Sequence, residues 1–450
     1  MQGSFSPSRR RFLQTLAAGA LAAPAAAQIP GERPRRDPGV EVLNPLARVP
    51  VSIIIDDSTC LVNLNHFSIP QFRRAWDYKS YEQDWRSTPR EIPDSFVRKF
   101  GEWAAENGVK GKYSIVPYPA CVGRLDIEVP GWTRQELDAS IGLVRDLMTP
   151  NWDIHPEMIT HTRVIDLKTG HPIPECNLQT MENWRWSDNR SVDELASYMS
   201  YALRILHNID LPCEGVTTPG GFGTRALPQL SQATLEACRD VYRAEIPHYF
   251  RHLFDKGEES VAPRVEYAAG LDTDDPRCAV SIIGCTGDWT GGWDASTEGE
   301  LDRFITPDLS AGRLVDVIER GEPACIVCHW TGVYWNGREV GFKIFQEVVR
   351  RLHARYDHLT WMKLGEISRY WAAKELTAVE KTAAGATFRA PFAAPAFTVA
   401  IEGPGEPRFQ GKPLQRVGSA KQLRAGTFAE DGARRIVCFD LPKGRSELSV

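Results

Sequence analysis

The chain has 450 residues, of which 42% are hydrophobic and 10% aromatic, so it is long enough to bury one large core and a smaller second one. Its formal net charge of −5 provides no basic field for nucleic acid or for an anionic membrane surface. We therefore expect a compact protein whose partner is a small-molecule substrate, with no nucleic acid involved.

The first 27 residues have the composition of a targeting segment. Residues 8–13 have the sequence SRRRFL, residues 16–23 form an apolar run, and residues 25–27 are three alanines suited to cleavage. The segment resembles a twin-arginine export signal, which implies recognition by the twin-arginine export machinery and a periplasmic or secreted mature protein. The apolar run is too short for a permanent membrane anchor. Residues 28–48, rich in proline, arginine and glycine, are predicted to be a linker.

The first predicted strand ends on two aspartates. Residues 51–55 (VSIII) form a short apolar run, which is typical of a strand buried on both faces of a parallel sheet. Asp56 and Asp57 follow directly. Because the carboxyl ends of parallel strands carry the chemistry of α/β folds, these two carboxylates are candidate functional residues.

Residues 49–375 alternate predicted strands with predicted helices. Helices are predicted over 93–107, 133–147 and 191–208, and strands over 111–117, 152–155, 215–217, 279–285, 324–328 and 359–362. This alternation implies right-handed βαβ crossovers and a mostly parallel sheet, which we expect to be closed or nearly closed into an irregular (β/α) barrel. Residues 376–395 are predicted to be a second linker, and the alternating pattern of residues 396–450 predicts a small C-terminal β module.

Further polar residues follow the other predicted strands. His155 and His161 are close in sequence, residues 217–223 form a glycine-rich loop, Asp288 follows a third strand, and His329 follows a fourth. Imidazole nitrogens combined with a strand-end carboxylate give a mixed nitrogen and oxygen site with an open position, as in catalytic zinc centres.

The order of these motifs resembles that of the polysaccharide deacetylase (NodB-homology) family over residues 51–371. Asp56 is similar to the catalytic aspartate of that family, and Asp57 and His161 to its metal-binding aspartate and histidine. Asp288 is similar to the aspartate of its fourth motif and His329 to its general-acid histidine. The resemblance implies a divalent metal, zinc by expectation, and hydrolysis of an acyl group on a saccharide.

Two positions depart from the family pattern. Its second metal-binding histidine would fall at Ile165, and the arginine that orients the catalytic aspartate would fall at Thr217. We expect His155 to supply the missing ligand, beside the alternative that it only forms a hydrogen bond with a neighbouring carboxylate. The residues assigned to substrate binding are Pro219, Gly220, Phe222, Trp289 and Trp330.

The predicted function is therefore that of an exported metal-dependent hydrolase. It would remove an acyl group, by expectation acetyl, from a saccharide or cleave another non-peptide C–N bond, with Asp56 as the base and with His329, oriented by Asp288, as the acid. Two alternatives stay open. In the first, the chain is a non-catalytic carbohydrate-binding protein on the same scaffold. In the second, it is a glycosidase that uses Asp56 and Asp288 as a carboxylate pair.

Overall fold

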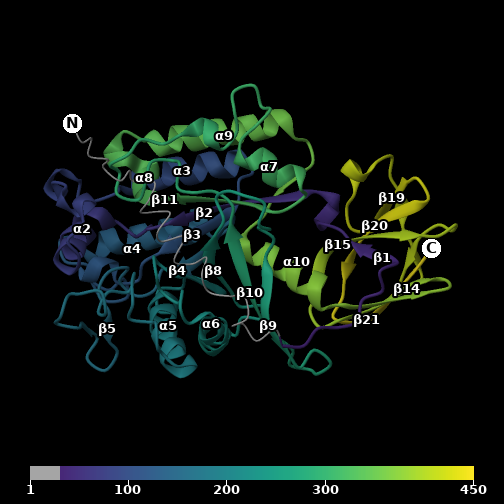
Figure 1. Cartoon of the computed structure of the whole chain (residues 1–450), viewed down its shortest axis with the longest axis horizontal. Coiled ribbons are helices and arrows are strands. Elements are labelled where there is room, and N and C mark those ends of the chain that lie inside the picture. The colour runs from purple at the N-terminus through teal and green to yellow at the C-terminus, as the bar shows by residue number, and fades with distance from the viewer. Residues whose placement is uncertain (1–30) are drawn as a thin grey trace, which may run out of the picture.

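The computed structural model describes residues 31–450, so the predicted export signal lies outside the described residues. The described chain forms a large α/β part and a C-terminal part built of strands (Figure 1). Within residues 31–450, no helix has both the length and the apolar composition that are needed to cross a membrane.

Two sheets form the centre of the α/β part. The first has the order β11-β2-β3-β4, with β12 also paired to β2, and all its pairs are parallel. Its strands are β2 (Val49–Asp56), β3 (Gly111–Ile115), β4 (Trp152–Pro156), β11 (Ala324–His329) and β12 (Leu359–Trp361). The second has the order β7-β8-β10-β9, in which only β9 is antiparallel. Its strands are β7 (Gly215–Thr217), β8 (His248–Leu253), β9 (Arg264–Ala269) and β10 (Arg277–Gly284).

The strand β2 is mostly apolar because both of its faces are covered. All eight residues of β2 are buried. Ile53 and Ile55 belong to the largest hydrophobic cluster, whereas Ile54, on the opposite face, belongs to a second cluster. This burial on both faces confirms the predicted parallel α/β architecture.

The two sheets are linked at their edges without forming one continuous barrel. Glu157, just after β4, makes an isolated parallel bridge with Thr217 at the end of β7. On the other side, the backbone N–H of Cys285 donates to the carbonyl oxygen of Cys325 at 2.8 Å. The described residues therefore form two sheets whose neighbouring edges are linked on both sides by these isolated contacts, and a fully closed barrel is not observed.

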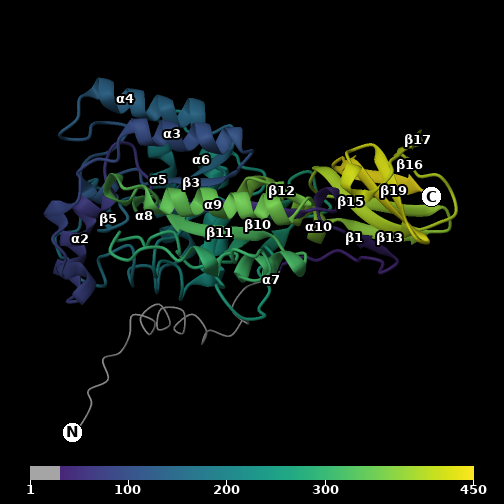
Figure 2. The same ribbon diagram turned by 90° about the horizontal axis from the view of Figure 1, so that it is seen from above.

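Helices cover the sheets on the outside (Figures 1 and 2). Their bounds are α2 (Leu64–Ala75), α3 (Asp94–Glu106), α4 (Arg134–Leu143), α5 (Val192–His207), α6 (Leu227–Tyr242), α7 (Arg313–Glu319), α8 (Trp330–Tyr334), α9 (Val340–Arg355) and α10 (Leu364–Leu376). The helix α4 begins with a capping box between Thr133 and Glu136, and α5 with one between Ser191 and Glu194. A short hairpin of β5 (Ile165–Asp166) and β6 (His171–Pro172) follows β4.

The C-terminal part consists of two five-stranded sheets, ordered β1-β15-β20-β19-β18 and β13-β14-β21-β16-β17. The strands of the first sheet are β1 (Val40–Val42), β15 (Ala394–Glu402), β18 (Gln415–Arg416), β19 (Thr427–Asp431) and β20 (Arg434–Leu441). Those of the second are β13 (Ala378–Thr382), β14 (Gly385–Ala390), β16 (Arg408–Phe409), β17 (Lys412–Pro413) and β21 (Gly444–Ser449).

These strands correct both predicted linkers. The strand β1 lies inside residues 28–48 and pairs with β15, because Val40 and Val42 bury their side chains in the C-terminal sheets. The strands β13 and β14 lie inside residues 376–395. The C-terminal part therefore begins directly after α10 and recruits a segment from near the start of the described chain.

The C-terminal part packs on the α/β part through α10. Leu364, Ile367 and Trp371 of this helix share a hydrophobic cluster with Ile54 of β2 and Phe397 of β15. The helix α2, which follows the carboxyl end of β2, lies at the opposite end of the molecule (Figures 1 and 2). The carboxyl ends of the parallel strands are thus turned away from the C-terminal part.

Candidate metal and catalytic site

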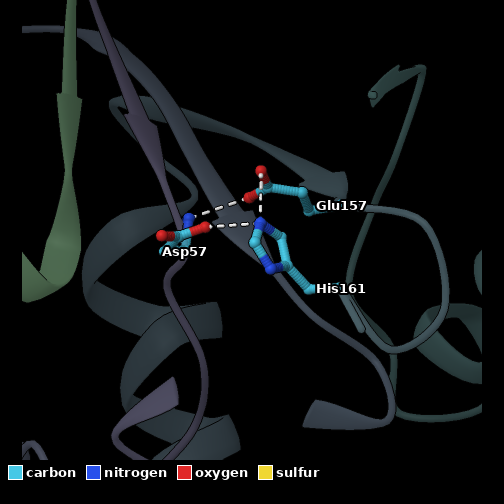
Figure 3. Close-up of side chains that lie close together, drawn as sticks. All are labelled: Asp57, Glu157 and His161. Atoms are coloured by element: carbon cyan, nitrogen blue, oxygen red, sulfur yellow. Dashed lines mark hydrogen bonds and ion pairs between the residues drawn. The ribbon is translucent and has the colours of Figure 1, made fainter. Parts of the chain in front are cut away.

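Three buried side chains converge where β2 and β4 end (Figure 3). One carboxylate oxygen of Asp57, Oδ1, lies 2.7 Å from Nε2 of His161, and Oε1 of Glu157 lies 3.4 Å from the same nitrogen. The other oxygen of Glu157 accepts a hydrogen bond from the backbone N–H of Asp57 at 2.8 Å. One possible ligand atom from each residue lies within 4.8 Å of the other two.

This group fits a divalent metal ion. Asp57 Oδ1 is buried and accepts no hydrogen bond, although His161 Nε2 is close to it. Two carboxylates and one imidazole are a usual ligand set for divalent transition metals. Burial lowers the pKa of His161, but the carboxylates of Asp57 and Glu157 outweigh burial and raise it well above its ordinary value. Metal binding must therefore displace a proton from this imidazole.

The loop that carries His161 has a strained backbone held by a buried carboxylate. Met158 and His161 have φ angles of 52° and 63°, a region that non-glycine residues rarely adopt. The carboxylate of Glu182 accepts the backbone N–H groups of Thr160 and His161, the latter at 2.6 Å, and the hydroxyl of Tyr198 at 2.5 Å. Burial raises the pKa of Glu182 to about 7, against the lowering effect of these hydrogen bonds.

Asp56 lies next to Asp57 and has a different partner. Lys112 of β3 donates a short hydrogen bond to Asp56 Oδ1. Burial raises the pKa of Asp56 to about 6, and the positive charge of Lys112 limits this rise.

His329 and Asp288 form an ion pair beside these aspartates. His329 ends β11, and its backbone position pairs in register with Asp56 on β2. Nδ1 of His329 lies 2.8 Å from Oδ2 of Asp288. Burial lowers the pKa of His329, but Asp288 and then Asp57 outweigh it and raise the pKa to about 10, so the imidazole carries a proton at neutral pH. The structure thus brings Asp56, Asp57, His161, Asp288 and His329 together.

His155 is not part of this group, which corrects its assignment as a metal ligand. Its Nε2 lies 3.0 Å from Nε2 of His248, and its Nδ1 lies 3.3 Å from Oγ1 of Thr217. His155 and Glu157 are two residues apart, so they lie about 7 Å apart along the chain direction of β4. Only Glu157 reaches the strand end, and His155 lies deeper in the core.

Three residues assigned to substrate binding are core residues instead. Trp330 is fully buried and packs on Phe96 and Phe100, with ring centroids 5.0 and 5.1 Å apart. Phe222 is fully buried as well. Trp289 is 7% exposed, since Phe304 and the guanidinium of Arg303 cover it.

In the glycine-rich loop of residues 217–223, one of the two remaining residues assigned to substrate binding is buried and the other is exposed. Pro219 is buried, and Gly220 is exposed in a turn with φ of 47°. A Cβ atom at Gly220 would lie 2.6 Å from the carbonyl oxygen of Asn183, so this close approach requires glycine.

The aromatic residues that adjoin the site were not predicted from the sequence. The ring of Phe72 in α2 lies 6.3 Å from that of His161, and Trp184 and Trp293 lie 5.4 and 5.8 Å from Phe72. Trp184 and Trp293 are partly exposed, so they are better placed than Trp330 to contact a substrate. Trp293 lies close after the strand-end residue Asp288, and that position is the only signal that the sequence offered.

The comparisons with known proteins do not identify a family. No protein family model matches the sequence, and no curated protein matches it. Among solved structures, the chain is similar to Puue allantoinase with 10% sequence identity and a TM-score of 0.33, over 73% of this chain and 91% of that one. It is also similar to a 4-alpha-glucanotransferase from Thermococcus litoralis with 10% identity and a TM-score of 0.34, over 71% of this chain and 40% of that one. The function must therefore be argued from the geometry of the site.

Proposed function

We propose that the protein is an exported metal-dependent hydrolase that removes an acyl group, such as acetyl, from a saccharide or cleaves another non-peptide C–N bond. The observation that carries this proposal is the convergence of Asp57, Glu157 and His161 on one point beside Asp56 and His329. This arrangement offers a metal-binding group, a base and an acid at one end of the sheets.

The formal charges of the site support a dication. Four carboxylates lie at these strand ends, namely those of Asp56, Asp57, Glu157 and Asp288. Two cationic side chains lie with them, Lys112 and protonated His329. With His161 neutral, as a ligand must be, a dication brings the formal charge of this buried group to zero. Buried charges are tolerated only when they are balanced in this way.

The side chains divide the reaction between them. A bound divalent metal supplies Lewis-acid polarisation of the acyl carbonyl and lowers the pKa of water. Asp56 accepts a proton from the attacking water while the oxygen of that water forms a bond to the carbonyl carbon. His329 then donates its Nε2 proton to the leaving nitrogen or oxygen while the bond to carbon breaks, because Asp288 holds Nδ1 and keeps the ring in place.

The test combines metal analysis with product release. Residues 28–450 would be purified, saturated with Zn²⁺, Mn²⁺ or Co²⁺, dialysed and analysed for metal. The same protein would be screened for acetate or ammonia release from N- and O-acetylated saccharides and from small cyclic and linear amides. We expect about one metal per chain and a kcat that Asp56→Asn lowers about 10²–10⁴-fold, leaving a measurable residual rate. Bound metal without turnover would favour a binding protein, and metal-independent hydrolysis of an aryl glycoside would favour a glycosidase.

Export is part of the same proposal and rests on residues 8–13, the apolar run of residues 16–23 and the alanines of residues 25–27. Replacing Arg9 and Arg10 together by lysine should leave the full-length precursor in the cytoplasm of the expressing bacterium. Unchanged recovery in the periplasm or medium would contradict the twin-arginine assignment.

A further inference from the structure

Lys112 is a fully buried lysine in the middle of the first sheet. Its side chain is 0% exposed, although lysine is among the residues least often buried. The ammonium group donates to the carbonyl oxygen of Ile55 at 3.0 Å, to Oγ of Ser114 at 2.7 Å and to Oδ1 of Asp56. All three of its N–H donors are therefore used.

A contribution to stability does not by itself explain why the charged side chain of Lys112 is buried in this sheet. Taking an ammonium and a carboxylate out of water costs several kcal/mol per ion, and buried ion pairs are often no more stable than apolar residues of similar size. The neighbouring positions show what the sheet otherwise accepts, because Ile53, Ile54 and Tyr113 are buried and uncharged. The pair of Lys112 and Asp56 therefore calls for a role in the site.

The two carboxylate oxygens of Asp56 have different surroundings. Lys112 holds Oδ1, and within residues 31–450 the other oxygen, Oδ2, accepts no hydrogen bond. The Asp56 side chain retains 7% exposure. One oxygen is thus anchored from inside the sheet, and the other is left for a ligand at the strand end.

We propose that Lys112 is a positioning residue that fixes the carboxylate of Asp56 for proton transfer. It acts through Asp56 and has no contact with the substrate. This inference rests on the proposed function, in which Asp56 accepts the proton of the attacking water. Removing the anchor would let the carboxylate rotate, and small misplacements of a reacting group cost about 100-fold in rate.

The test is a double-mutant cycle with four chains: wild type, Lys112→Met, Asp56→Asn, and Asp56→Asn/Lys112→Met. Lys112→Met should lower kcat about 100-fold, change KM by less than about twofold and leave the metal content unchanged. Because Lys112 acts through Asp56, the double variant should have the same kcat as Asp56→Asn, within about twofold. Lys110→Met is the matched control, since Lys110 pairs with Glu366 near the surface, outside the site, and this variant should keep the wild-type kcat.

The cycle still tests the inference when one variant does not fold. Lys112→Met leaves a buried carboxylate without its cation, whereas the double variant has no buried charge at either position. If Lys112→Met does not fold, the kcat of the double variant relative to Asp56→Asn decides the matter, and a further fall beyond about twofold overturns the inference. Full kcat in Lys112→Met also overturns the inference but leaves the hydrolase proposal standing, whereas a metal-loaded wild type that is inactive on every substrate overturns both.

Discussion

Glu157→Gln tests whether Glu157, rather than His155, completes the candidate metal site. The amide keeps a carbonyl oxygen that can accept the N–H of Asp57, a hydrogen bond of 2.8 Å in the wild type. The substitution therefore removes a negative charge and a metal ligand while it retains the local fold. The backbone N–H of Asp57 keeps its acceptor, and comparing each variant with and without metal cancels any change in the free energy of unfolding that the substitution causes by itself.

The expected magnitude follows from binding linkage. Free metal at 100 times its dissociation constant stabilises the wild type by about 2.7 kcal/mol. Outer-sphere changes alone weaken metal sites about 10–100-fold, so the loss of one of three ligands should cost at least about 100-fold. At the same metal concentration the variant would then gain only about 0.4 kcal/mol. The metal-dependent stabilisation should thus shrink by about 2.3 kcal/mol.

The assay is urea unfolding with and without added metal, with a chelator in the metal-free samples. Glu266→Gln is the matched control, because Glu266 is a buried carboxylate of β9 outside the site, and it should keep the full metal effect. His155→Ala should also keep the metal effect, whatever its cost in stability. The reasoning would be refuted by a Glu157→Gln variant that keeps the full stabilisation, and more sharply if His155→Ala loses it.

Three further outcomes are expected. Burial, reinforced by Arg251, lowers the pKa of His252 from 6.5 to about 4, so this histidine stays neutral in the fold while the unfolded chain takes up a proton below pH 6.5. Stability should therefore fall between pH 6.5 and 4, and the urea midpoint of His252→Leu should fall less over that range. Trp330→Ala should cost about 3–5 kcal/mol of stability, with Trp330→Phe keeping the wild-type KM, and a raised KM at unchanged stability would show substrate contact instead. Ending the chain after residue 376 exposes Leu364 and Trp371, so this variant should aggregate at concentrations where the full chain remains monodisperse in light scattering.

The sequence was sufficient to predict the elements whose pattern is local. The residues of β2 before Asp56 are apolar except for Ser52, because both faces of the strand are covered, and Asp56 is its last residue. The capping box that begins α4 is visible in the sequence as Thr133 with Glu136. Because parallel strands bring their carboxyl ends to one edge, residues as distant as Asp57 and His329 could be expected to lie together.

Elements that depend on long-range pairing were not predictable in this way. The strand β1 has only three residues, and its partner β15 lies far along the chain. Its composition is that of a linker, so no local signal separates it from its surroundings. The role of Lys112 was hidden for a similar reason, since a lysine in a strand is expected to face solvent until its partner Asp56 on the neighbouring strand is known.

The difference between His155 and Glu157 shows which kind of information the sequence lacks. His155 and Glu157 are two positions apart, so strand alternation predicts the same face for both, and both residue types bind metals; residue type and alternation therefore rank them equally. Depth along the strand decides between them. At position 155 the neighbours are His248 and Thr217, which occupy both ring nitrogens, whereas the side chain at position 157 accepts a hydrogen bond from the backbone of Asp57, directly after β2. Depth depends on the register between strands, and that register is set by packing across the whole sheet. Spacing within one segment therefore cannot decide which of two residues on one face binds a metal. That decision also requires the register in which the strand pairs with its neighbour.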